Sequence, residues 1–130
     1  MIFLKGRISE HLEPFIEGVA ILDKRGGSIP FNAILDTGFN DELVLPDYLF
    51  RRAHLVPSGV TQYQMADGSQ VRDTVYRGAL LIGARKIKVR LSLTAARVGL
   101  LGMRLLLRRV ATFDLHKKIF WVEERNFRKK

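Results

Sequence analysis

The chain has 130 residues, of which 47% are hydrophobic and 27% charged, and these values fit one ordinary globular domain. It contains no cysteine, which excludes a disulfide framework and a thiolate metal site. The apolar residues 1–4 are too few for a signal peptide, and no apolar run reaches membrane-spanning length. We therefore expect a soluble, cytoplasmic protein with a single domain over residues 1–130 and a charged tail from about residue 123.

The formal net charge of +9 is compatible with an acidic partner such as nucleic acid. The basic residues are spread along the chain, however, and aromatic residues are not interleaved with them as base-stacking platforms require. The sequence therefore argues against nucleic acid as the main partner. A basic adaptor that binds nucleic acid is the weakest of three candidate functions.

The first half of the chain is expected to form short strands. Residues 18–22 form an apolar run, a charged and glycine-rich turn follows at 23–28, and residues 29–35 form a second run. Residues 42–46 indicate another short strand that ends at a proline. Residues 47–54 are expected to form a helix with Asp47 as its N-cap.

The second half indicates two hairpins and a late helix. Residues 60–65 and 70–76 flank an Asp-Gly turn, and residues 87–93 alternate as a half-buried strand does. Residues 103–110 are the best helix candidate, and a final hairpin is expected over residues 111–122. Many short strands with regular turns and one late helix indicate a small β-barrel or sandwich.

Asp36 directly follows an apolar strand, which places a carboxylate at the edge of the core, where an unpaired charge is costly. Gly38 lets the backbone turn sharply, and the Thr37 hydroxyl can bond a neighbouring backbone group. Asp, Thr and Gly are also common turn residues, so the plainest interpretation of the triplet by itself is an ordinary turn.

Three motifs in chain order resemble the retropepsin family of aspartic proteases over roughly residues 19–115. The first is the apolar strand into Asp36-Thr37-Gly38, followed by the strand at 42–46. The second is the hairpin at 66–69, where the family carries its flap, and the third is the Gly-Leu-Leu-Gly-Met segment at 99–103. The resemblance implies a mainly β fold, a small closed β-barrel of the retropepsin type with one short helix in its C-terminal half.

The resemblance also implies roles for individual residues. Asp36 would be the catalytic acid, Thr37 would brace two active-site loops at a dimer axis, and Gly38 would offer backbone to substrate. Phe39 stands where retropepsins usually have alanine or serine, and it is similar to an Asp-Thr-Gly-Phe variant in a prokaryotic single-domain branch. Asn40 and Asp41 would line the substrate channel. The flap would be formed by Ala66, Asp67, Gly68 and Ser69. Leu101 and Gly102 would support the Asp36 loop from behind as a buttress.

Aspartic-protease chemistry needs two carboxylates that share one proton, and this chain has one such motif. Two-fold symmetry would supply the second Asp36, so we expect a homodimer, with residues 1–8 and 119–122 adding interface strands. The predicted function is that of an aspartic endopeptidase acting on peptides or proteins, with no cofactor, no metal and no membrane partner. The alternative is a non-catalytic retropepsin-like module that binds a peptide or protein, because Phe39 would narrow the cleft.

Overall fold

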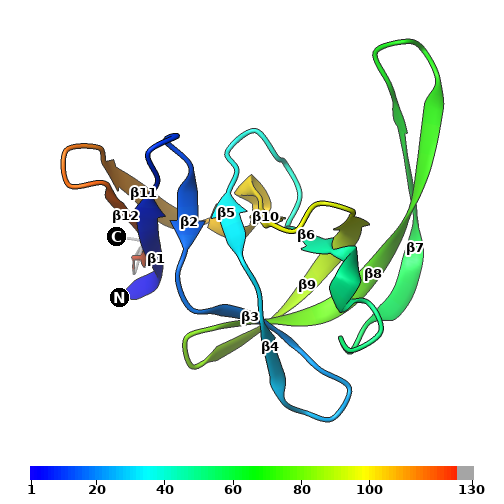
Figure 1. Cartoon of the computed structure of the whole chain (residues 1–130), viewed down its shortest axis with the longest axis horizontal. Coiled ribbons are helices and arrows are strands. Elements are labelled where there is room, and N and C mark those ends of the chain that lie inside the picture. Colours follow the sequence, from blue (N-terminus) through cyan, green and yellow to red (C-terminus); the bar gives the residue numbers. More distant parts are fainter. Residues whose placement is uncertain (126–130) are drawn as a thin grey trace, which may run out of the picture.

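The computed structural model describes residues 1–125, and this part of the chain is almost entirely β-structure (Figure 1). Two short 3-10 turns, η1 (Asp47–Leu49) and η2 (Met103–Leu106), accompany one twelve-stranded mixed sheet. The predicted mainly β class is therefore confirmed, and the described residues contain no helix long and apolar enough to cross a membrane. The strands are β1 (Ile2–Ile8), β2 (Pro14–Ile16), β3 (Val19–Leu22), β4 (Ser28–Pro30), β5 (Ala33–Leu35), β6 (Leu43–Pro46), β7 (Val56–Gln64), β8 (Gln70–Ile82), β9 (Arg85–Thr94), β10 (Gly99–Leu101), β11 (Arg109–Asp114) and β12 (Ile119–Glu124).

Hydrogen bonds connect the strands in the order β11-β12-β1-β2-β5-β10-β6-β9-β8-β3-β4, with β7 attached to β8. β10 pairs in parallel with β5 and antiparallel with β6, and β6 pairs in parallel with β9. The path ends at β11 on one side and β4 on the other. Over residues 1–125 the curved sheet is thus not closed into a ring by hydrogen bonds.

The strands around β10 form the part of the core that lies beneath the Asp36 segment. Leu101 pairs in register with Leu35 on one side and Leu43 on the other, and all three side chains are at most 2% exposed. Fully burying a leucine side chain contributes about 1.5–3 kcal/mol. Asp36, which follows Leu35 directly, is therefore attached to a strand that is firmly packed in the core.

Strands from the two ends of the described chain lie side by side in the order β11-β12-β1-β2, and we call these four strands the terminal sheet. β1 pairs with β12 and β2, and β12 pairs with β1 and β11. The expectation that these terminal segments add interface strands stays a prediction. Within the chain, β1 and β12 pair with one another, and β2 pairs only with Gly6–Ile8 of β1. Glu123 and Glu124 belong to β12 rather than to a charged tail, and the rest of the predicted tail from residue 126 lies outside the described residues.

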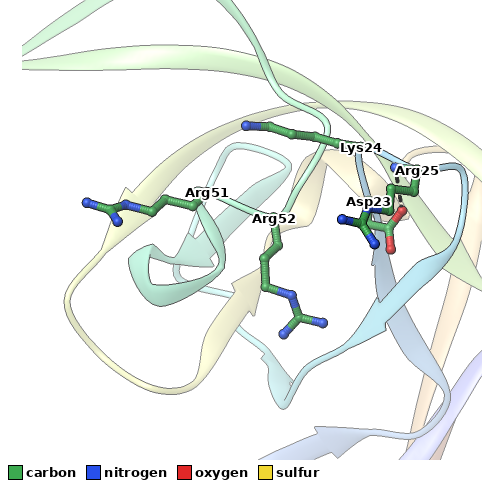
Figure 2. A pocket seen from close by; sticks show the side chains of 5 residues that line it. All are labelled: Asp23, Lys24, Arg25, Arg51 and Arg52. Carbon is green, nitrogen blue, oxygen red and sulfur yellow. Dashed lines mark hydrogen bonds between the residues drawn. The ribbon is translucent and has the colours of Figure 1, made fainter.

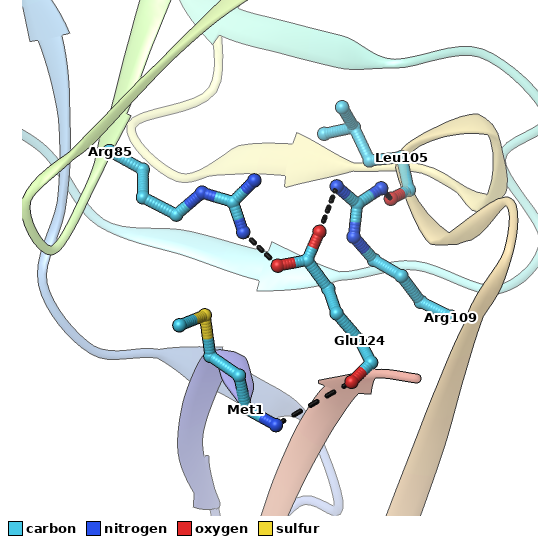
Figure 3. Close-up of polar contacts among 5 residues, drawn as sticks. All are labelled: Met1, Arg85, Leu105, Arg109 and Glu124. Atoms are coloured by element: carbon cyan, nitrogen blue, oxygen red, sulfur yellow. Dashed lines mark hydrogen bonds and ion pairs between the residues drawn. The ribbon is translucent and has the colours of Figure 1, made fainter. Parts of the chain in front are cut away.

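A polar cluster ties this terminal sheet to η2 (Figure 3). The Glu124 carboxylate accepts hydrogen bonds from Arg85 and, at 3.1 Å, from Arg109. Arg109 also donates to the Leu105 carbonyl at 2.9 Å, and its guanidinium lies 3.8 Å from the centre of the Phe3 ring. β9, η2, β11 and β12 are held together at this point.

The predicted helix over residues 103–110 shrinks to the 3-10 turn η2. Leu107 already has an extended backbone (ψ 131°), and Arg108 has a positive φ of 64°, so the helix cannot continue. The residues from Arg109 onward pair with β12 instead, because tertiary pairing overrides local helix propensity.

The predicted helix over residues 47–54 is likewise reduced to η1. Pro46, not Asp47, occupies the N-cap position, and Ala53 forms an isolated β-bridge with Asp23. The apolar run at 29–35 is also divided into β4 and β5, because β4 pairs with β3 whereas β5 pairs with β2 and β10.

Candidate active site

The Asp36 segment begins where β5 ends, between strands of the buried core. The Asp36 backbone N–H donates to the Leu101 carbonyl at 2.8 Å, which continues the β5–β10 pairing by one residue. Its half-buried carboxylate accepts a hydrogen bond from the Gly38 N–H at 2.9 Å. Thr37 and Gly38 are exposed, so the tight turn presents the carboxylate at the surface.

Gly102 lies directly behind the segment that follows Asp36. A Cβ atom on Gly102 would lie 2.1 Å from the Asp41 carbonyl oxygen and 2.8 Å from that of Phe39. Two further hydrogen bonds hold the segments together, from the Gly102 N–H to the Glu42 carbonyl at 3.0 Å and from the Met103 N–H to the Phe39 carbonyl at 2.8 Å. Only glycine permits this approach of two backbones.

The Phe39 ring lies against the same glycine. Its Cδ2 atom would be 2.5 Å from a Cβ on Gly102, and the side chain is half-buried. Phe39, the aromatic residue that distinguishes this motif, therefore occupies the space that a side chain at position 102 would fill. The sequence motif did not show this contact, because the two residues are 63 positions apart.

Asp41 is joined to two basic residues from other parts of the fold. Its carboxylate lies 3.3 Å from Arg90 Nε and 3.9 Å from Arg104 Nε. The neighbouring Glu42 side chain accepts a hydrogen bond from the Arg90 backbone N–H at 2.7 Å. Asp41, which we expected to line a substrate channel, is thus engaged in holding the loop to β9 and η2, whereas Asn40 beside it is exposed.

The four flap residues form the tip of the long β7–β8 hairpin, which extends away from the body of the molecule in Figure 1. Ala66, Asp67, Gly68 and Ser69 are all exposed, and Gly68 has a φ of +90° that favours glycine. The Asp67 carboxylate accepts hydrogen bonds from the Ser69 N–H (2.9 Å) and hydroxyl (2.6 Å), which lower the pKa of Asp67. These bonds lie within the tip.

A pocket of about 390 Å³ opens beside Asp36 and Thr37. Three exposed apolar side chains line it: Leu12 (63% exposed), Phe113 (40%) and Leu115 (61%). We call these three residues the apolar patch. Sequence reasoning missed it, because its members come from the β1–β2 loop and the β11–β12 hairpin and meet only in the folded chain.

The structure thus brings together Asp36, Thr37, Gly38, Phe39, Asp41, Leu101 and Gly102, and places the flap residues at a separate hairpin tip. Within residues 1–125, no three histidine, cysteine or acidic side chains gather as a metal site would require. The arrangement offers one carboxylate on a rigid turn next to an uncovered apolar surface.

Comparisons with known proteins relate this geometry to one fold. No protein-family model and no curated protein sequence matches the chain. Among solved structures, a retropepsin-like aspartic protease from Rickettsia conorii matches with a TM-score of 0.59 and 17% identity, covering 92% of this chain and 89% of that one. The EIAV protease (TM-score 0.48, 24% identity) covers 68% of this chain and 82% of its own length. The foamy viral protease–reverse transcriptase (TM-score 0.46, 15% identity) covers 65% and 10%.

The match to the Rickettsia conorii structure extends over most of both chains. The chain therefore has a retropepsin-like fold, as the three sequence motifs had indicated. At this level of identity the likeness concerns the fold, and the chemistry depends on the residues that this chain places at the site.

Proposed function

We propose that the chain is an aspartic endopeptidase that acts as a homodimer, with one Asp36 from each copy. The observation that carries the proposal is the position of Asp36, a half-buried carboxylate on a rigid turn at the end of a core strand. That turn is packed on Gly102 in a chain with a retropepsin-like fold. A plain surface turn would not need so close a backbone contact behind it.

In the proposed dimer, two Asp36 carboxylates face one another and share one proton, because two close carboxylates cannot both ionise. The ionised carboxylate takes a proton from a water molecule while the protonated one donates to the carbonyl oxygen of the scissile peptide. As the water oxygen bonds to the carbonyl carbon, the C=O π bond breaks and a tetrahedral diol forms with no covalent link to the enzyme. The C–N bond then breaks as the leaving amine takes the proton held by the first carboxyl, and the second carboxylate takes a proton from a diol hydroxyl, which restores the pair. One carboxyl of the pair must be protonated while the other is ionised, so we expect cleavage to be best at acidic pH.

The apolar patch supports the placement of the second copy. Leu12, Phe113 and Leu115 are exposed around a pocket that also contains Asp36 and Thr37. β11, which carries Phe113, pairs with β12 and is the last strand on its side of the sheet path. A second chain that covers the patch would lie next to Asp36, where the second carboxylate is needed.

The position of Phe39 favours catalysis over a purely binding module. Its ring lies against Gly102, behind the turn, which leaves the exposed Gly38 backbone accessible to an extended peptide. The β7–β8 hairpin supplies the segment that would close over such a peptide.

The proposal is tested by exposing a peptide library to the wild type and to Asp36→Asn across acidic and neutral pH. We expect cleavage by the wild type and a loss of about 10³-fold or more in Asp36→Asn, because the variant cannot provide the acid–base pair. Asp47→Asn, which changes an exposed aspartate of η1, is the matched control and should cleave normally. A folded, dimeric wild type that cleaves nothing would leave the peptide-binding module as the function.

A further inference from the structure

A second concave site lies where the β3–β4 hairpin meets the end of η1 (Figure 2). It has a volume of about 430 Å³ and is lined by Asp23, Lys24, Arg25, Arg51 and Arg52. We call it the basic pocket. Figure 2 shows its four basic side chains coming from two loops around the space between them.

The backbone that carries these cations is firmly held. Asp23 and Ala53 form a β-bridge, the Lys24 N–H donates to the Arg52 carbonyl at 3.0 Å, and the His54 N–H donates to the Leu22 carbonyl at 2.9 Å. Ala53 is 1% exposed and anchors this connection in the core. The two loops are thus fixed to one another, and a ligand that bridges them would not have to order them first.

The charge of the pocket is not neutralised within the described chain. Six arginines elsewhere lie within 4.0 Å of a carboxylate: Arg7, Arg85, Arg90, Arg104, Arg109 and Arg125. No such ion pair involves the four cations of the basic pocket in the part of the chain that the structure describes. Its single carboxylate, Asp23, accepts hydrogen bonds from the N–H groups of Arg25 (2.8 Å) and Gly27 (2.9 Å) and so stabilises its own turn.

We propose that the basic pocket binds an acidic segment of a polypeptide, through carboxylates or phosphorylated side chains. Clusters of arginine recognise such oxyanions because the guanidinium group offers two parallel donors. The four cationic residues line one compact concavity, and no aromatic side chain lines it for base stacking. These features favour a short acidic segment over a nucleic acid strand. If the proposed proteolysis is correct, a segment of the substrate is one such ligand.

Fluorescence anisotropy with labelled peptides tests this binding. The protein carries Asp36→Asn so that the peptide stays intact and the result does not depend on whether the chain is a protease. Three peptides of equal length are compared, one rich in glutamate, one with serine in place of each glutamate, and one with phosphoserine. We expect the two anionic peptides to bind and the serine peptide not to bind, with the stronger anionic peptide identifying the oxyanion.

The decisive comparison is between two variants with the same change in net charge. Arg51→Gln/Arg52→Gln removes two cations of the pocket, whereas Lys117→Gln/Lys118→Gln removes two exposed cations from the β11–β12 turn. We expect the first to weaken binding of the anionic peptides about tenfold and the second less than about twofold. Lys24→Gln/Arg25→Gln removes the two cations of the other loop and should weaken binding as much as Arg51→Gln/Arg52→Gln does. If circular dichroism shows that Arg51→Gln/Arg52→Gln is unfolded, Lys24→Gln/Arg25→Gln takes its place in the comparison.

Equal binding of the serine peptide, or equal losses in the pocket and control variants, would overturn the proposal. An oligonucleotide that binds more tightly than the anionic peptides, and does so through Arg51 and Arg52, would also overturn it and assign the pocket to nucleic acid.

Discussion

At the scale of single residues, Gly102 is a point at which the segment after Asp36 packs tightly against the chain behind it. The space for one Cβ atom is taken by the Asp41 carbonyl oxygen and by the Phe39 ring. Phe39 and Gly102 are thus complementary, because the large residue occupies the space that the small one leaves.

The substitution Gly102→Ala should destabilise the fold by about 3 kcal/mol, because a backbone carbonyl that is 2.1 Å away cannot move aside as a side chain can. Thermal or urea unfolding measures the effect. Gly27→Ala is the control, since its nearest neighbour would be the Asp23 side chain at 3.1 Å, and it should cost less than about 1 kcal/mol. A fully stable Gly102→Ala would contradict the close packing described for this loop.

The residues of the candidate site were predictable to different degrees. Asp36, Thr37 and Gly38 are adjacent in the chain, so their place after an apolar strand was visible in the sequence. The ion pairs of Asp41 with Arg90 and Arg104 were not, because they join residues 49 and 63 positions apart. No periodicity or turn signal reports such a contact.

At the scale of elements, the tip of the β7–β8 hairpin is stabilised by contacts within itself, whereas the terminal sheet is stabilised by contacts with other elements. The tip of the hairpin is exposed, and its polar side chains bond to one another. The terminal sheet is held by an ion cluster that reaches other elements.

Asp67→Ala should leave the free energy of unfolding nearly unchanged, because Asp67 lies exposed at the hairpin tip. Peptide cleavage should nevertheless fall several-fold, because the flap loses the two bonds to Ser69 that shape its tip. The measurements are urea unfolding and kcat/KM. Asp23→Ala removes an equivalent cap from the β3–β4 turn and should leave cleavage of a neutral peptide unchanged. If Asp67→Ala and Asp23→Ala cleave at the same rate, the hairpin tip at residues 66–69 has no role in cleavage and the predicted flap is wrong.

Glu124 should make the stability of the terminal sheet depend on pH. The hydrogen bond from Arg85 lowers the pKa of the Glu124 carboxyl, and the positive charges of Arg85 and Arg109 act in the same direction. A carboxyl whose pKa is lowered by folding stabilises the folded state above its ordinary pKa, and this contribution is lost as pH falls through the lowered value.

We therefore expect Glu124→Gln to lower Tm by a few degrees at neutral pH, and the difference from the wild type to shrink as pH falls below the ordinary range of carboxylates. Calorimetry at several pH values measures this. Glu17→Gln, whose partner Arg7 is 83% exposed, should change Tm little at any pH. A difference that grows on acidification would contradict a lowered pKa for Glu124.

At the scale of the whole molecule, the proposed dimer depends on the apolar patch. Leu115→Lys places a charge in the surface that the second copy would cover, and it should weaken dimerisation at least about tenfold. Sedimentation over a range of concentrations measures this without reference to activity. Tyr48→Lys, which is 56% exposed and outside the patch, adds the same charge and should leave the dimer intact. A Leu115→Lys protein that dimerises as tightly as the wild type would place the interface elsewhere.

The sequence by itself determined the mainly β class, the hairpin turns at residues 23–28 and 66–69, and the place of Asp36 after a buried strand. These features depend on neighbouring residues, whose turn chemistry and hydrophobic alternation act locally. Only the tertiary structure decided that both predicted helices end after one turn, that β1 and β12 pair within the chain, and that the apolar patch meets Asp36. Each of these depends on partners far apart in sequence, and the burial and hydrogen bonds they supply outweigh local propensity.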